Sequence, residues 1–418
     1  MKNKTCISLL AVCALHLAHN AQANSAAAVE KTTYIKAENS LSTERLGATT
    51  LIPLKLLAQD TPQKQYLTEI NNQYVANQKV DINNDGVLDT LLVIADYAPN
   101  ASVEIKVTAP ISGQLALTYP PLTQAEMGMR LGGVISAEGI NSGGAYYPMS
   151  SMTLPPSHKI GDKLYKYEGF GWESDRVAYR FYFDERGLID IFGKRIPNLV
   201  LDQVGLDKGD YHTLSDWGMD ILKVGPSLGM GGAAGWLDGK VQHPNNLSNL
   251  SVTLDNGPLQ SGAKVTQSGW KLGKKTLDFS RKFSIDAHSN LTHTQVTSSA
   301  AMGSLAIGIV KHGVAKLENI TANSEWNYLA TFGKQSLAED ALGMVVFFRH
   351  RDLQLITSDE FNELAILKMK TTADYYFGAR WQGEAQSITT QEAFYDYLEK
   401  TRIELNTPIN VSIDQQKH

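Results

Sequence analysis

Long stretches of this chain alternate between apolar and polar residues, and that period of two limits what it can fold into more than any other feature. The alternation is clear over residues 175–184, 271–285 and 291–296, and residues 343–348 form the apolar-rich run typical of a buried strand. Helical periodicity is sparse, with its clearest cases at residues 359–367 and 390–405. Because repeated alternation of strands and helices is missing, a doubly wound parallel sheet is disfavoured. We predict a mostly β protein.

The first 23 residues resemble an export signal. Lys2 and Lys4 precede an apolar run over residues 7–17, and residues 21–23 (Ala-Gln-Ala) fit a small-x-small cleavage site. The run is too short to span a membrane as a helix in the mature protein, and no later window is long and apolar enough to do so. We therefore expect a periplasmic or secreted protein with a cleaved signal peptide, 1–23, and no membrane span in the mature chain.

Cysteine content and charge restrict the chemistry further. Both cysteines, Cys6 and Cys13, lie inside the predicted signal, so the mature chain would hold no thiol and no disulfide. The formal net charge is −5, with 43 acidic against 38 basic side chains. Sequence-independent nucleic-acid binding needs a basic surface that displaces counterions from phosphate, so we expect no nucleic-acid partner.

Composition divides the rest of the chain into three parts. Residues 24–140 are interpreted as an N-terminal β region, and residues 141–161 are rich in glycine, serine and proline, which predicts a linker. Over residues 162–418 the expected strands are longer and the aromatic residues denser, so we place the main domain there.

The N-terminal region contains a loop with the spacing of a calcium site. Oxygen-bearing side chains occupy positions one, three, five and nine of this loop: Asp81, Asn83, Asp85 and Asp89. Gly86 follows at position six, but position twelve is Leu92, where an EF-hand has a glutamate. The alternative is a hairpin turn, because Asn-Asp-Gly between β runs is a turn signal. Any calcium here would be structural.

Residues 175–184 predict a strand with two different faces. One face is apolar and belongs to the core: Val177, Tyr179, Phe181 and Phe183. The other face carries two guanidiniums, a phenol and a carboxylate: Arg176, Arg180, Tyr182 and Asp184. With Trp172 and Trp217 flanking it, this composition suits a cleft for an acidic sugar chain. The alternative is a solvated strand face with cross-strand ion pairs.

The histidines show no metal-ligand spacing, so a transition-metal site is not indicated. His212 stands out because Asp210, Tyr211 and Asp216 lie close to it in sequence, where general acid–base chemistry could be arranged. His288 and His293 are second candidates.

Residues 172–225 resemble a bacterial domain family that is named only as a domain of unknown function. Members of this family commonly occur beside genes for pectate, alginate or ulvan degradation. The resemblance rests on residues 172–180 (WESDRVAYR), 190–194 (DIFGK), 210–212 (DYH) and 216–225 (DWGMDILKVG). It implies a galactose-mutarotase-like β-supersandwich and a role in polyuronide breakdown. An arginine is expected after residues 257–259 (Gly-Pro-Leu), and this chain has Gln260 there instead.

We therefore expect an enzyme that eliminates across C4 and C5 of a uronic acid unit and expels a sugar or water, as a lyase or a dehydratase. The C5 proton becomes acidic when a cation neutralises the neighbouring carboxylate, a base then removes the proton, and an acid protonates the leaving oxygen. Arg180 or Arg176 would be the cation, and His212 with Tyr211 or Tyr182 would share the base and acid roles. The predicted substrate contacts are Trp172, Glu173, Trp217, Lys194 and Lys223.

No organic cofactor is needed for this chemistry, and the expected partner is an acidic oligosaccharide or polysaccharide. Two alternatives stay open. The carboxylates Glu173, Asp175 and Asp184 could supply the pair that a glycoside hydrolase uses. The protein could also bind acidic oligosaccharides in the periplasm without catalysis.

Overall fold

The computed structural model describes residues 31–57, 65–109, 117–207, 209–415 and 417. The predicted signal peptide, residues 1–23, lies outside these described residues. Within them, no helix is long and apolar enough to cross a membrane.

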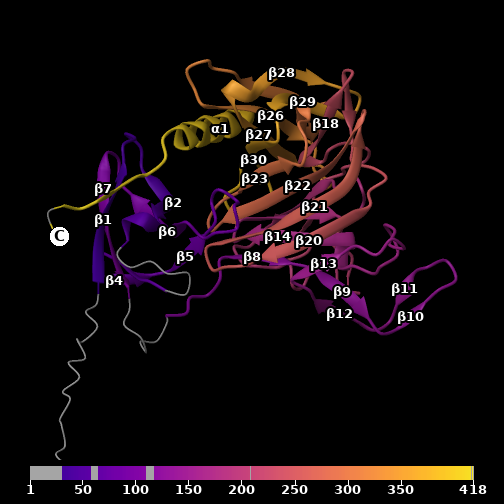
Figure 1. Ribbon diagram of the computed structural model, residues 1–418, viewed down its shortest axis with the longest axis horizontal. Helices are drawn as coiled ribbons and strands as arrows, with labels where there is room; N and C mark the ends of the chain where they lie inside the picture. Colours follow the sequence, from indigo (N-terminus) through magenta and orange to yellow (C-terminus); the bar gives the residue numbers. More distant parts are fainter. Residues whose placement is uncertain (1–30, 58–64, 110–116, 208, 416, 418) are drawn as a thin grey trace, which may run out of the picture.

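Two small sheets near the N-terminus form a unit with its own apolar core, drawn in indigo in Figure 1. The first sheet has the strand order β31 (Asn410–Ile413), β1 (Lys31–Asn39), β7 (Ala101–Ala109), β3 (Leu67–Ile70) and β4 (Gln73–Val75). The second has the order β2 (Arg45–Pro53), β6 (Thr90–Tyr97) and β5 (Asn77–Val80), with the short 3-10 helix η1 (Leu54–Leu56) after β2. Because β31 pairs with β1, the chain returns to this N-terminal unit at its end.

Three antiparallel sheets form the main body. The nine-stranded sheet has the order β13 (Ser151–Thr153), β20 (Asn249–Asp255), β21 (Gln260–Leu272), β22 (Lys275–Asp286), β23 (Leu291–Ser298), β30 (Thr372–Trp381), β27 (Ala341–Arg349), β26 (Trp326–Lys334) and β25 (Ala315–Asn319). The β14 sheet has the order β17 (Gly218–Asp220), β16 (Ile189–Lys194), β15 (Val177–Tyr182), β14 (Gly169–Ser174) and β8 (Thr123–Glu126). The β18 sheet has the order β19 (Lys240–Gln242), β18 (Met230–Leu237), β24 (Gly303–Val310), β29 (Asn362–Met369) and β28 (Leu353–Ser358).

The remaining elements are short, apart from one helix. Two two-stranded sheets pair β9 (Gly128–Leu131) with β12 (Ala145–Pro148) and β10 (Val134–Ile135) with β11 (Asn141–Ser142). Two further 3-10 helices are η2 (Lys166–Glu168) and η3 (His350–Asp352), and the α-helix of the described residues is α1 (Gln391–Asn406).

The inner face of the nine-stranded sheet packs against both the β14 sheet and the β18 sheet. Their inward side chains form one apolar cluster, in which Trp172 of β14 stacks on Phe283 of β22 at 4.9 Å and Ile307 of β24 is fully buried. Period-two alternation explains this, because every second residue of each strand points inward. The predicted mostly β supersandwich is confirmed.

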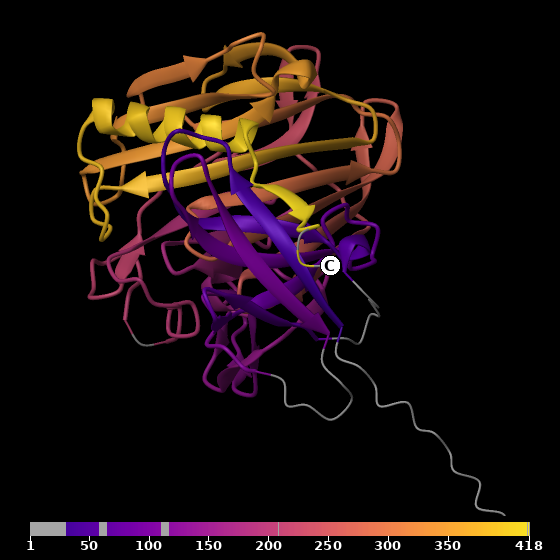
Figure 2. The same ribbon diagram turned by 90° about the vertical axis from the view of Figure 1, so that its left-hand side faces the viewer.

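The opposite face of the nine-stranded sheet is covered by α1 and by the N-terminal unit, as Figure 2 shows. Thr390 caps the helix by accepting a hydrogen bond from the Ala393 N–H, and Phe394 and Leu398 are buried against β26 and β27. The helix predicted at residues 390–405 is therefore confirmed.

The helix predicted at residues 359–367 is wrong, because the chain forms β29 there. Four consecutive residues of β29, Leu364 to Leu367, are buried on both faces of the β18 sheet. A continuous apolar run of this kind does not show the period of two, so it is easily mistaken for a buried helix.

The predicted domain boundaries also need correction. Residues 141–161 contain β11, β12 and β13, and β13 is an edge strand of the nine-stranded sheet, so this segment is not a simple linker. Strand β8 already pairs with β14 in the main body, although it lies within residues 24–140. At the other end, β31 leaves the main body for the N-terminal unit.

The outer face of the β14 sheet is covered by residues 195–207 and 209–217, which contact it through both apolar and polar side chains. Glu173 lies there with no exposed surface and accepts hydrogen bonds from the Lys194 ammonium at 2.6 Å and from the backbone N–H groups of Val200 and Leu201 at 2.8 Å each. Gln124 donates to the same carboxylate at 2.6 Å. This buried carboxylate therefore fastens the covering segment to the sheet.

We predict that Glu173→Ala destabilises the fold by about 3–5 kcal/mol, because it leaves the Lys194 ammonium buried without its counter-charge. Urea unfolding followed by circular dichroism measures the change. The control is Glu318→Ala, which removes a solvent-exposed carboxylate and is expected to change stability by less than about 0.5 kcal/mol. Equal stability of the two variants would show that the Glu173 contacts do not hold the segment.

Candidate active site

A groove of about 500 Å³ lies between the nine-stranded sheet, the N-terminal unit and the end of α1. Its floor comes from the outward positions of β22, β23 and β30, including Ser284, His293 and Tyr376. The inward positions of β22 are buried in the core, so alternation alone places its polar residues on the groove side. The volume lies within the range of about 300–1,000 Å³ that is usual for small-molecule sites.

A histidine–carboxylate pair stands at one end of this groove. Asp175, in the turn between β14 and β15, accepts hydrogen bonds from the His288 backbone N–H at 2.7 Å and from the His288 Nδ1 at 2.9 Å. Because the carboxylate only accepts, Nδ1 carries a proton, and in the neutral form of the ring Nε2 is left with a lone pair. The side chain of His288 is 33% exposed and lines the groove, so Nε2 can act as a base.

The local backbone explains how His288 is positioned. His288 has a left-handed φ of 63°, which turns the chain between β22 and β23. Its ring packs against Gly47 of β2, where a Cβ atom would lie only 3.2 Å from the His288 Cβ. Glycine at residue 47 therefore lets the N-terminal unit close over the imidazole.

The His288–Asp175 pair shifts both pKa values. The hydrogen bond to Asp175 raises the pKa of His288 above its usual value. Burial raises the pKa of Asp175, but the hydrogen bonds and charge of His288 outweigh that effect and lower it overall. The pair therefore favours a charged imidazolium next to a carboxylate.

The groove floor holds a second titratable cluster. His293 stacks on Tyr376 at 4.4 Å between ring centres, and its Nε2 lies 3.5 Å from the Asp374 carboxylate. Asp286 accepts hydrogen bonds from Thr49 at 2.7 Å and from Gln260 at 2.8 Å, and burial raises its pKa. Burial, followed by the charge of Asp286, raises the pKa of Tyr376, so this phenol keeps its proton.

Three cations line the groove, and two of them are already neutralised. Lys282 donates to the Asp81 carbonyl at 2.7 Å and has the Asp81 carboxylate 3.6 Å away, while Arg349 is paired with Asp374 and Glu325. Arg45 differs, because it forms no ion pair among the described residues, although the charge of Glu404 on the same groove wall acts on it. It donates to the Thr407 carbonyl at 2.8 Å, and among the described residues its Nε is buried without a partner.

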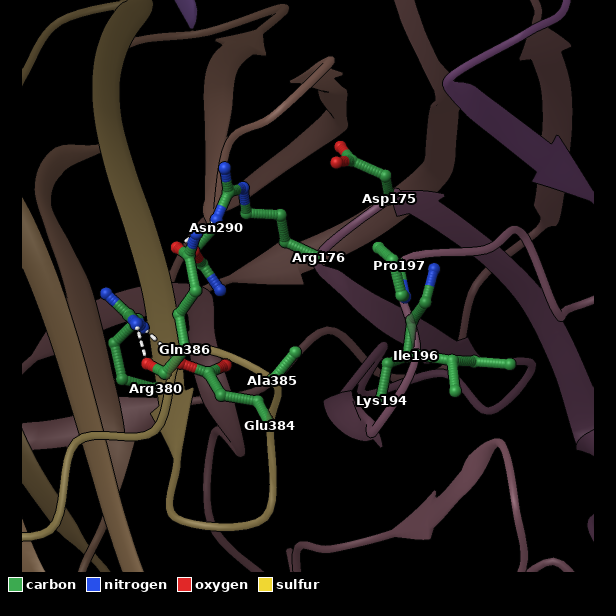
Figure 3. Close-up of a pocket in the computed structure, with 10 residues that line it drawn as sticks. All are labelled: Asp175, Arg176, Lys194, Ile196, Pro197, Asn290, Arg380, Glu384, Ala385 and Gln386. Atoms are coloured by element: carbon green, nitrogen blue, oxygen red, sulfur yellow. Dashed lines mark hydrogen bonds and ion pairs between the residues drawn. The ribbon is translucent and has the colours of Figure 1, made fainter. Parts of the chain in front are cut away.

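Arg176 lies in a smaller side pocket of about 190 Å³ that also includes Asp175 (Figure 3). The structure places Arg176 in the turn before β15, so it does not share a strand face with Arg180 as predicted. Arg176 is accessible at this pocket, and its predicted role as a carboxylate-binding cation stays a prediction.

Arg180 does not have the predicted role. Its side chain has no exposed surface, and its guanidinium contacts Asp190 and lies 2.7 Å from Asp220. With both carboxylates in place, this cation cannot neutralise a substrate. The alternative interpretation, a strand face with cross-strand ion pairs, therefore describes this face better than the predicted cleft does. The structure differs from that interpretation because the ion pairs are buried and not solvated.

The other predicted catalytic residues do gather around Arg180. Tyr182 and Tyr211 contact its guanidinium, and the exposed His212 has Nδ1 at 2.8 Å from Asp210 and Nε2 at 3.6 Å from Asp220. Burial raises the pKa of Tyr182, so the phenol is a poor base. Burial and the charge of Asp190 raise the pKa of Asp220 to about 8. Catalytic roles for His212 and Tyr211 stay predictions.

Three predicted substrate contacts need correction. Trp172 is fully buried in the core and donates through Nε1 to Thr292 at 2.9 Å, so neither face of its ring can stack on a sugar. Glu173 and Lys194 bind one another at 2.6 Å beneath residues 195–217, although Lys194 also borders the side pocket. Trp217 and Lys223 line neither cavity, and their sugar contacts stay predictions.

The Asp81–Asp89 loop is closed by its own hydrogen bonds. Asp81 accepts from the backbone N–H of Asp85 at 3.2 Å and of Gly86 at 3.0 Å, and Asn83 accepts from that of Asp85 at 2.9 Å. Asp89 accepts from the Ile82 N–H at 3.3 Å. In the described residues, no group of three or more His, Cys, Asp or Glu side chains is arranged to hold a metal ion. Structural calcium at this loop stays a prediction.

Some groove residues were not predicted from the sequence, and only part of them follow a pattern that could have identified them. The outward positions of β22, Lys282, Ser284 and Asp286, follow directly from the alternation over residues 271–285 and could have been assigned to one face. Arg45 could not have been found in this way, because it comes from β2, far away in the sequence.

The fold and the groove together define a β-supersandwich protein with an open polar cleft on the outer face of its largest sheet. Residues 37–411 match the family described as Domain of unknown function (DUF4861), and the chain belongs to this family. A curated relative is "Uncharacterized protein P7" of Formosa agariphila, which is 24% identical over 271 residues, corresponding to 59% of this chain and 67% of that protein.

Two solved structures match the chain at low similarity. One is a protein in the glycosyl hydrolase family 38 from Enterococcus faecalis, with a TM-score of 0.45, 8% identity and coverage of 92% of this chain and 48% of that chain. The other is an alpha-mannosidase from Enterococcus faecalis V583, with a TM-score of 0.42, 8% identity and coverage of 92% and 46%. The chain thus spans about half the length of either structure.

We predict that Asp175→Asn shifts the titration of His288 to lower pH. The carboxylate favours the imidazolium, so its loss lets His288 give up its proton at a lower pH than in the wild type. NMR titration of the histidine ring protons, with His288→Gln to assign the signal, measures this shift. The signal of the exposed His212 should stay unchanged, and an unshifted His288 signal would contradict the pairing.

Proposed function

We propose that the protein is an exported enzyme that acts on uronic-acid-containing oligosaccharides or polysaccharides by elimination in the groove. The observation that carries this proposal is the position of Arg45, a groove cation that forms no ion pair among the described residues and whose Nε is buried there without a hydrogen-bond partner. The Glu404 carboxylate lines the same groove and acts on Arg45 through its charge, but it is not within ion-pair distance. Arg45 lies two residues before Gly47, which contacts the His288 ring. A guanidinium that recognises carboxylates therefore lies on the strand that touches the histidine base.

The groove offers the three groups that elimination needs. Arg45 would bind the uronate carboxylate and make the C5 proton more acidic. Nε2 of His288, in its neutral form, would take that proton, and Asp175 would stabilise the resulting imidazolium. Tyr376 keeps its proton because its pKa is raised, so it would donate to the leaving oxygen.

The proposed step balances without a cofactor. The C5–H bond and the C4–O bond break, a double bond forms between C4 and C5, and the leaving sugar or water departs with the proton from Tyr376. The proton on His288 then returns to the phenolate through solvent. Either a lyase or a dehydratase fits this scheme.

Hydrolysis is less well supported by the carboxylates. Glu173 is buried against Lys194, Asp175 is hydrogen bonded to His288, and Asp184 is bound by Arg186 at 2.6 Å. These three carboxylates therefore do not form the free acid–base pair that glycoside hydrolases use.

We predict that incubation with oligogalacturonates, alginate oligomers or ulvan oligomers produces the far-ultraviolet absorbance of a conjugated double bond. His288→Ala should reduce kcat at least about 100-fold, because general base catalysis is lost. His212→Ala removes the rival base predicted from the sequence, and it should keep its activity if the reaction takes place in the groove. Reducing ends without new absorbance would indicate a hydrolase. The absence of both signals would indicate a binding protein. Activity lost in His212→Ala but kept in His288→Ala would move the site to the outer face of the β14 sheet.

A further inference from the structure

The side pocket is a second cavity beside the groove, and its walls come from four parts of the chain (Figure 3). The turn after β14 supplies Asp175 and Arg176, the segment after β16 supplies Pro197, the turn after β22 supplies Asn290, and the loop before α1 supplies Gln386. At about 190 Å³ it is smaller than most ligand sites, so it suits a single charged group or sugar unit better than a chain.

Arg176 is a cation of this pocket that forms no ion pair among the described residues, although the nearby carboxylates of Asp175 and Glu384 act on it through their charges. Arg380 contacts the Glu384 carboxylate, and Lys194 binds Glu173 at 2.6 Å, so both of those cations have counter-charges. The Arg176 guanidinium contacts the amide oxygen of Gln386, and among the described residues its Nε is buried without a partner. No described carboxylate lies within ion-pair distance of it.

An arginine in this state is ready to bind an anion. Its planar fork can bind both oxygens of a carboxylate, and a partly buried cation gains more from a counter-charge than one in open water. The Asn290 and Gln386 amides beside it suit neighbouring hydroxyl groups.

The side pocket and the groove share a wall. His288, Ser289 and Leu291 line the groove, whereas Asn290, within the same turn, lines the side pocket. Asp175 also lines the side pocket and binds His288 across this wall. A ligand unit at Arg176 would therefore lie next to the unit that reaches the histidine.

We infer that the side pocket is a carboxylate-binding subsite, in which Arg176 holds the acidic group of the sugar unit next to the one that reacts. This inference rests on the proposed function for the identity of the ligand. It narrows the substrate class to chains with at least two acidic units, such as oligouronates. Chains in which a single uronate lies among neutral sugars would bind less well.

The test is isothermal titration calorimetry on the His288→Ala protein, so that binding is measured without turnover. The probes are trigalacturonate, a mannuronate trimer and the fully methyl-esterified trigalacturonate. We expect one of the acidic trimers to bind and Arg176→Gln to weaken its affinity roughly 10- to 100-fold. Arg351→Gln, which removes the same charge from an exposed arginine outside both cavities, should leave the affinity unchanged.

A second variant guards against a folding defect in Arg176→Gln. Gln386→Glu places a carboxylate on the side chain that already contacts Arg176, so it should satisfy the cation internally and weaken binding while the thermal stability is kept. Unchanged affinity in both variants, binding of the ester as tight as that of the acid, or no binding by either acidic trimer overturns the subsite.

The two proposals can fail separately. Tight, Arg176-dependent binding with no elimination by the wild-type protein would leave the subsite standing and overturn the proposed reaction. Elimination by the wild-type protein, together with unchanged affinity in Arg176→Gln, would support the proposed reaction and overturn the subsite.

Discussion

The rest of the structure depends on the alternation of side chains along β22, which point in turn into the core and toward the groove. Its inward side chains, such as Phe279 and Phe283, are buried between the sheets, and this burial fixes the register of the whole strand. Its outward side chains, Lys282, Ser284 and Asp286, then necessarily face the N-terminal unit. A shift by one residue would bury these polar groups and expose the aromatic ones, so the core and the groove are specified by the same pattern.

The charged residues divide into two groups with different consequences. Buried cations such as Arg180 and Lys194 have carboxylate partners within the β14 sheet. The partner of Lys194, Glu173, also accepts hydrogen bonds from the backbone of Val200 and Leu201 and so binds the segment that covers the sheet. Such buried ion pairs cost desolvation, and removing one partner is far more damaging than removing both. Arg45 and Arg176 stand on either side of the His288–Asp175 pair and lack such partners in the described part of the chain. The cations proposed to bind the ligand are therefore not those that form the buried ion pairs.

Alternation was enough to predict the fold class, the inward face of Tyr179 and Phe181, and the strand at residues 291–296. A strand that is buried on one face has an apolar residue at every second position, and this pattern can be recognised within a few residues of sequence. Alternation could not show that the other face of β15 is covered, because the cover comes from residues 195–207 and 209–217, which form no helix or strand. Arg180, which was expected to be exposed, is therefore buried. Trp172 is buried for a different reason, because its side chain points into the core between the sheets. His288 and His293 were recognised as candidates. The partner of His288, Asp175, comes from another sheet, and no sequence pattern joins the two.

The central claim is that the groove between the N-terminal unit and the nine-stranded sheet is where an acidic sugar binds. A crystal structure of the His288→Ala protein with a bound oligouronate tests this most directly. We predict a sugar carboxylate on the Arg45 guanidinium, with C5 of the same unit facing the space left by the imidazole. A ligand bound instead over residues 195–217, next to His212, would contradict it.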